Sequence, residues 1–132
     1  MNLVTMRDLE DSTSAINGVA RSADEIVTLL EAATRRAPFF CALESHGHAL
    51  LVGVGRDCGC AQHSSEGRQP PYFMAVASRA VVATDLCQFL SGGQRSDVPQ
   101  RYCLAWSELR KIIEYFVGND GKMASAMTWE QI

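Results

Sequence analysis

Apolar residues recur along this chain with two spacings, one typical of helices and one typical of strands. Helical spacing appears twice, each time between recognisable start and stop signals. The first helix should begin at a capping box formed by Ser22 and Glu25 and end before Pro38. The second should begin near Trp106, where apolar residues return every three or four positions, and end at Gly118.

Short apolar runs of strand length occupy much of the remaining chain. Two of them flank the turn His46-Gly47-His48 and predict a β-hairpin, because Gly47 can adopt a positive φ. We expect strands at 39–45, 49–55, 72–77 and 80–90, with shorter ones near the N-terminus, at 101–105 and before Trp129. The polar, glycine-containing stretches 56–71 and 91–99 are expected to be loops. This order predicts a single α+β domain over residues 1–132, with a mainly antiparallel β-sheet packed against two principal helices.

Composition narrows the classes of function that fit this domain. Fifteen acidic residues against twelve lysines and arginines give a formal net charge of −3, which argues against binding nucleic acid by neutralising phosphates. We find no run of about 18 apolar residues that could span a bilayer, and no basic start followed by an apolar run. We therefore expect a cytoplasmic protein with no membrane or nucleic-acid partner. The five cysteines should be reduced and mostly buried in that compartment.

The densest candidate chemistry lies in the sequence RDCGCAQH, residues 56–63. Cys58, Cys60 and His63 could ligate a metal, with His46 or His48 as a fourth ligand, but the Cys-x-Cys spacing is too tight for the usual zinc knuckle. A nucleophilic cysteine with His63 as base would need a lowered thiol pKa, and no helix N-terminus follows to supply one. We therefore predict no bound metal, no cofactor and no catalysis. A small metal- or ligand-binding domain built on Cys58, Cys60 and His63 is the alternative.

The C-terminal third, residues 90–129, resembles the close of the Imm-one family of bacterial immunity proteins. The matching pieces are Phe89, Gly92-Gly93, Val98-Pro99, Glu114-Tyr115-Phe116 and Met127-Thr128-Trp129-Glu130. Lys122-Met123 stands where members of that family often carry Arg-Pro. Members accompany polymorphic toxins, often nucleic-acid deaminases. The resemblance implies a non-catalytic protein that binds the catalytic domain of a cognate toxin and occludes its active site.

A toxin that acts on nucleic acid needs a cationic substrate site, which an acidic inhibitor complements. Polar, glycine-rich loops on a sheet scaffold are common binding devices, so we expect the interface in the two predicted loops. The predicted partner-binding residues are Asp57, His63 and Glu66 from the first loop and Gln94, Arg95 and Asp97 from the second.

Overall fold

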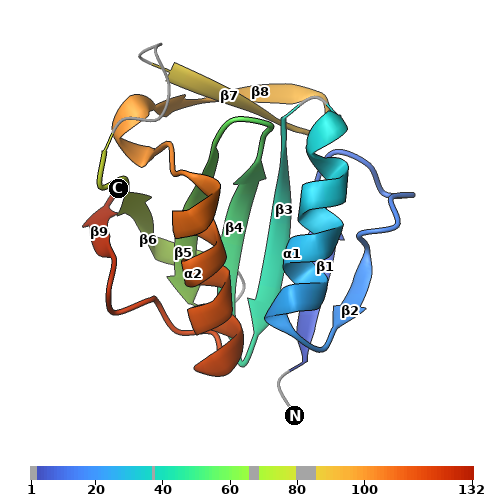
Figure 1. Ribbon diagram of the computed structural model, residues 1–132, viewed down its shortest axis with the longest axis horizontal. Coiled ribbons are helices and arrows are strands. Elements are labelled where there is room, and N and C mark those ends of the chain that lie inside the picture. The colour runs from blue at the N-terminus through green and yellow to red at the C-terminus, as the bar shows by residue number, and fades with distance from the viewer. Residues whose placement is uncertain (1–2, 37, 66–68, 80–85) are drawn as a thin grey trace.

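The computed structural model describes residues 3–36, 38–65, 69–79 and 86–132, and it places two helices on one face of a mainly antiparallel sheet (Figure 1). The helices are α1 (Ala23–Ala32) and α2 (Trp106–Gly118), with short 3-10 turns η1 (Ala33–Arg35) and η2 (Gln100–Tyr102). The described strands are β1 (Val4–Asp8), β2 (Gly18–Ala20), β3 (Phe39–Ser45), β4 (His48–Val54), β5 (Gly59–Ser65), β6 (Gln69–Val76), β7 (Leu86–Ser91), β8 (Gln94–Pro99) and β9 (Thr128–Gln131). Seven of them follow the order β2-β1-β3-β4-β5-β6-β9. The predicted α+β class is confirmed.

Both predicted helices are confirmed, and their ends follow the expected signals. The side chain of Ser22 accepts a hydrogen bond from the backbone amide of Glu25 at 3.1 Å, and the Glu25 carboxylate accepts one from Arg21 N at 3.0 Å. These contacts satisfy amides that have no partner within the helix. Trp106 starts α2 and anchors it, because its indole N–H donates to Gly55 O at 3.0 Å. No helix within the described ranges has the length and apolar content needed to cross a bilayer.

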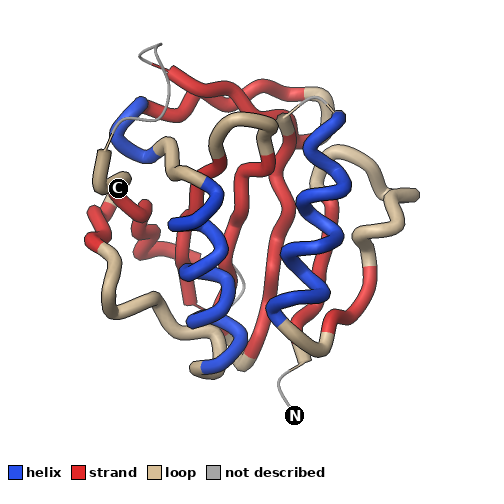
Figure 2. Tube along the Cα trace, viewed as in Figure 1, coloured by secondary structure: helices blue, strands red, loops and turns tan. Residues whose placement is uncertain are grey.

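The sheet is covered on both faces, and each face has its own apolar cluster. Side chains alternate between the two sides of a strand, so on β3 Phe39 faces the cluster under the helices, whereas Phe40 faces the opposite cluster. The antiparallel β7–β8 hairpin covers this second cluster, where Phe40 and Phe89 place their ring centroids 5.3 Å apart. The hairpin joins the sheet through a parallel contact of Phe39 with Leu90. Figure 2 shows the hairpin crossing beyond the ends of the central strands.

The prediction of a loop over 56–71 is wrong, because residues 59–65 form the central strand β5 and β6 begins at Gln69. The reason lies in the small residues of this segment. A Cβ on Gly59 would come within 2.7 Å of Leu109 Cδ2 in α2, so the helix lies directly over a strand that has room only for small side chains. Buried Ala61 continues the same face. The segment therefore contains few of the large apolar residues that mark a strand.

The prediction of a loop over 91–99 is also wrong, because most of this segment is strand β8. Gly92 and Gly93 take φ angles of 58° and 81° and form the turn between β7 and β8, so residues 94–99 continue as a strand. The expected strand at 101–105 is instead the 3-10 turn η2 followed by a single bridge from Leu104 to Gly59. Of the strand expected at 80–90, residues 80–85 lie outside the described part of the chain, and β7 begins at 86.

Candidate functional site

The β7–β8 hairpin is held in place at its turn by the loop that follows β1. The backbone amide of Gly92 donates to Leu9 O at 2.9 Å, and that of Gly93 donates to the Glu10 carboxylate at 2.8 Å. On the inner side of the hairpin, Phe89 and Val98 are buried in the second cluster. The hairpin is therefore a fixed platform with one face in the core.

The outer face of the hairpin is polar and exposed. Directly opposite residues on antiparallel strands share a face, so Gln88 and Asp97 lie together on the outside, and Arg95 shares that side. Gln88, Arg95 and Asp97 are exposed, and Arg95 Nη1 donates to Gln88 Oε1 at 3.2 Å. Asp57 reaches the same region, because it and Gln88 line one hollow of about 230 Å³.

These side chains and their neighbours make one surface around the hairpin, which we call the hairpin surface. It consists of Glu10, Arg56, Asp57, Gln88, Gln94, Arg95 and Asp97. The three carboxylates here outnumber the two guanidinium groups, so the surface is acidic in net terms.

Four of the six predicted partner-binding residues belong to this surface: Asp57, Gln94, Arg95 and Asp97. Glu66 lies outside the described residues. His63 needs a correction, because it lies within β5 and is only 5% exposed. Its Nε2–H donates to Gly121 O at 2.7 Å, so its side chain is part of the interior and not of a binding surface.

The sequence reasoning missed Glu10, Arg56 and Gln88 as members of the surface. The glycine pair after β7 is the sequence signal from which the position of Gln88 could have been predicted. Two adjacent glycines that can take positive φ predict a tight hairpin, and a tight hairpin fixes which residues face each other. Nothing in the local sequence places Glu10 there, since its position depends on a contact with Gly93 across 83 positions of the chain.

Cys58, Cys60 and His63 do not form a common site. Cys60 belongs to the cluster beneath the hairpin. His63 lies three positions further along β5 and faces the other way, with its ring 6.3 Å from that of Phe116 and 6.2 Å from that of Trp129. Burial raises the pKa of Cys60 to about 12, so its thiol stays protonated near neutral pH.

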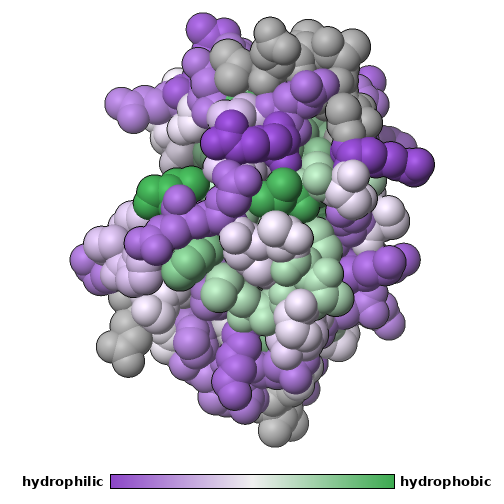
Figure 3. All heavy atoms as spheres, turned by 90° about the vertical axis from the view of Figure 1, so that its left-hand side faces the viewer, coloured by the Kyte–Doolittle hydropathy of each residue, from purple (hydrophilic) through white to green (hydrophobic). Residues whose placement is uncertain are grey.

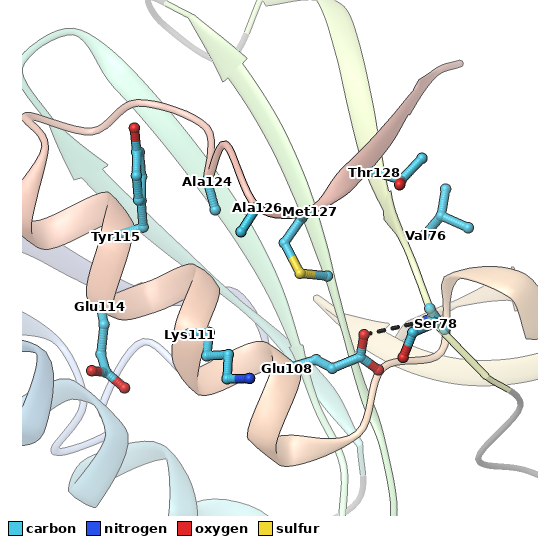
Figure 4. Close-up of a pocket in the computed structure, with 11 residues that line it drawn as sticks. Val76, Ser78, Glu108, Lys111, Glu114, Tyr115, Ala124, Ala126, Met127 and Thr128 are labelled. Atoms are coloured by element: carbon cyan, nitrogen blue, oxygen red, sulfur yellow. Dashed lines mark hydrogen bonds between the residues drawn. The ribbon is translucent and has the colours of Figure 1, made fainter.

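A second groove lies on another side of the molecule, between α2, the end of β6 and the segment before β9 (Figure 4). It measures about 740 Å³. Met127 extends into it toward the helix, and Glu108 accepts a hydrogen bond from the Ser78 amide at 3.2 Å. Figure 3 shows this side, with apolar residues near its middle and hydrophilic ones around them. Glu108, Glu114 and Lys111 line this groove and give it one net negative charge.

The groove is built from the part of the chain that carries the family resemblance. Tyr115 and Met127 line it, whereas Phe116 is buried in the main core. Trp129 packs against that core and donates its indole N–H to Ala124 O at 2.9 Å, which fixes the segment before β9. Comparison with known proteins adds no identity, since no protein-family model matches the chain and no curated protein matches it.

Proposed function

We propose that this chain is an immunity protein, which binds the catalytic domain of a cognate bacterial toxin and blocks its substrate site through the hairpin surface. One observation carries the proposal: polar side chains from three distant parts of the chain lie along one hairpin and carry a net negative charge. Asp57, Gln88 and Glu10 come from the turn before β5, from β7 and from the loop after β1. The resemblance of residues 90–129 to the Imm-one family gives the class of partner.

The electrostatics of the hairpin surface suit such a partner. A toxin that acts on nucleic acid presents a cationic groove to phosphates, and an acidic surface is attracted to that groove before contact. Complementary charge also raises the rate of association and disfavours wrong partners. The partner in this proposal is therefore a basic protein surface, with a deaminase or nuclease domain as its source.

The rigidity of the hairpin favours tight binding. Phe89 is 1% exposed and Val98 6%, so the strands that present the outer residues are anchored in the core. Little backbone freedom is then lost on binding, which leaves more of the contact energy as affinity. A standard interface of roughly 1,200–2,000 Å² would cover the hairpin surface and extend beyond it.

The experiment is a charge reversal at two positions, Asp57→Lys with Asp97→Lys, in the full-length chain. The matched control carries Glu44→Lys and Glu114→Lys, which make the same change in net charge on β3 and α2, away from the hairpin. Each variant is co-expressed with the toxin domain encoded by the neighbouring gene, and its affinity for that domain is measured by calorimetry.

We expect the double reversal at the hairpin to weaken binding by at least about tenfold, or about 1.4 kcal/mol, chiefly through slower association, and to lose protection of the host cell. The control should protect as the wild type does. Full protection by the hairpin variant would contradict the proposed surface. A loss of binding and protection in the control variant alone would indicate that the interface lies nearer the groove beside α2, and would contradict the hairpin surface. If the wild-type chain neither binds nor protects, the immunity function itself is refuted.

A further inference from the structure

Three cysteines from separate parts of the chain meet beneath the β7–β8 hairpin. Cys58 lies in the turn between β4 and β5, Cys87 lies on β7, and Cys103 follows η2. Cys87 Sγ is 3.2 Å from Cys58 Sγ and 2.7 Å from Cys103 Sγ, and all three sulfur atoms lie within 4.8 Å of one another. The three are free thiols.

The spacing of these sulfur atoms is close to what one metal ion requires. Three thiolates bound at about 2.3 Å from one ion stand roughly 3.7–4 Å apart. Two of the separations, 3.2 and 2.7 Å, are shorter than that value, and the third is at most 4.8 Å, so shifts of about an ångström would reach it. Thiolate sulfur is a soft ligand that selects Zn²⁺ and Cu⁺ over harder cations.

The surroundings give an ion a route in and room for one more ligand. Cys58 and Cys87 line the hollow of about 230 Å³ beside the hairpin, together with Asp57 and Gly55. Cys103 is fully buried and closes the inner side, and Cys87 is only half-buried. A fourth ligand, such as water, could approach from the hollow. That arrangement suits tetrahedral Zn²⁺, whereas three sulfurs alone satisfy Cu⁺.

The thiols of Cys58 and Cys103 are protonated in the absence of an ion. Burial, together with hydrogen bonding to Cys87, raises the pKa of Cys58 to about 12. Burial and the same neighbour raise the pKa of Cys103 as well. An ion would therefore displace protons to solvent as the sulfur–metal bonds form, and its affinity should rise with pH.

We propose that Cys58, Cys87 and Cys103 bind one soft metal ion, Zn²⁺ or Cu⁺, which links the β7–β8 hairpin to the central sheet. A disulfide between Cys87 and Cys103 is the competing fate of these thiols. We favour the metal because a disulfide would use two sulfurs and leave the third buried without a role, whereas an ion uses all three. The proposal is independent of the immunity function.

The test uses the full-length chain, reduced and metal-free, and titrates it with Zn²⁺ against a chromophoric chelator and with Cu⁺ against a copper(I) chelator. Wild type should bind one equivalent of at least one of these ions. Cys87→Ala should bind it more than about 100-fold more weakly, since the central ligand is removed. Cys41→Ala is the matched control, because Cys41 is a buried cysteine that packs in the other cluster under the helices.

Two further measurements separate the alternatives. Thermal unfolding should show a rise in Tm with the ion for wild type and Cys41→Ala but not for Cys87→Ala, and Cys58→Ala provides a second variant should Cys87→Ala fail to fold. Co²⁺ should give sulfur-to-metal charge-transfer bands that weaken in Cys58→Ala. Equal affinity in wild type and Cys87→Ala overturns the proposal. An absence of binding also overturns it. In that case mild oxidation of the wild type with hydrogen peroxide, which is reduced to water, tests for the competing Cys87–Cys103 disulfide by mass spectrometry.

Discussion

Arg36→Met is the substitution whose effect can be worked out most fully from the structure. Its partner Asp8 lies at the end of β1 with a fully buried side chain, whereas the side chain of Arg36 is 34% exposed. The Asp8 carboxylate accepts hydrogen bonds from Arg36 Nη1 and from the amides of Glu10 at 2.9 Å and Asp11 at 3.0 Å. These contacts hold the loop that grips the turn of the hairpin at Gly93.

The expected loss of unfolding free energy depends on the hydrogen bonds that remain to the Asp8 carboxylate when the guanidinium group is removed. Breaking a fully buried ion pair by removing one partner costs about 3–5 kcal/mol. Partial exposure of Arg36 and the two remaining amide donors reduce this, so we expect Arg36→Met to cost about 2 kcal/mol of unfolding free energy. Methionine keeps an apolar chain over the ring of Phe39, which the Arg36 guanidinium carbon now approaches to 4.0 Å from the centroid. The loss should therefore reflect the charge and not the packing.

The assay is urea unfolding of wild type, Arg36→Met, Asp8→Asn and the double variant. A double-mutant cycle isolates the pair, and we expect a coupling energy of about 1–2 kcal/mol. A coupling energy near zero, or a cost for Arg36→Met below about 0.5 kcal/mol, would refute the reasoning.

The Asp8–Arg36 ion pair also predicts how stability changes at low pH. Burial by itself raises the pKa of Asp8, but the hydrogen bonds from Arg36 and from the amides of Asp11 and Glu10 outweigh it, so the net pKa is below its usual value of 3.8. Stability from this group is therefore present above that value and is lost as pH falls through the lower folded pKa. The difference in unfolding free energy between wild type and Arg36→Met should become smaller as pH falls toward about pH 3. A difference that stays constant or widens in acid would show that the ion pair is not its source.

Three other predictions concern backbone fit and buried charge. Gly121→Ala should cost about 2–4 kcal/mol, because φ is +82° and the new Cβ would lie 2.4 Å from Ser45 O; Gly118→Ala, with nothing within 4 Å, should be neutral or slightly stabilising in the same urea titration. Gly53→Ala would place its Cβ 2.5 Å from a buried sulfur and 2.9 Å from an aromatic ring, and should lower Tm by several degrees in calorimetry. Burial lowers the pKa of His63, so stability should fall as pH drops below about 6.5, and His63→Gln should flatten that part of the pH–stability curve.

The elements that sequence alone predicts well are those whose signals are local. The capping pair at Ser22 and Glu25 lies within one helical turn, and the helix begins there. Gly47 takes a φ of 78°, and the predicted hairpin forms around it, although His48 already belongs to β4 and lies opposite Ser45. In each case the residues that decide the structure are neighbours in the chain, so no tertiary information is needed.

The strand β5 was missed because its composition is set by a neighbour far away in sequence. Gly59 is small because Leu109 of α2 lies against it, and His63 is polar yet buried because Gly121 O accepts a hydrogen bond from its ring. A strand that accommodates a helix and a buried histidine loses the large β-branched residues by which strands are recognised. Such segments resemble loops until the element that covers them is known.

The candidate site shows the same limit more sharply. Asp57 and Asp97 were selected from separate loops on polarity alone, and their convergence depends on the contact of β7 with β3 at Phe39 and Leu90. That contact joins positions about fifty residues apart. The alternative site considered from the sequence joined Cys58 to its near neighbours Cys60 and His63, whereas the fold gives Cys58 a partner in Cys87, 29 positions away.

The hairpin connects the two proposals without making them depend on each other. Alternation along β7 turns Gln88 outward, beside Asp97, and turns Cys87 inward toward Cys103. An ion on the inner side would stiffen the strands that display the outer carboxylates, and would act on binding only through that stiffness. Charge reversal at Asp57 and Asp97 changes the outer potential and leaves the three sulfurs in place. If charge reversal weakens partner binding and cysteine substitution does not, the partner recognises the outer surface alone. If both changes weaken binding, the partner also requires a hairpin held rigid by the ion.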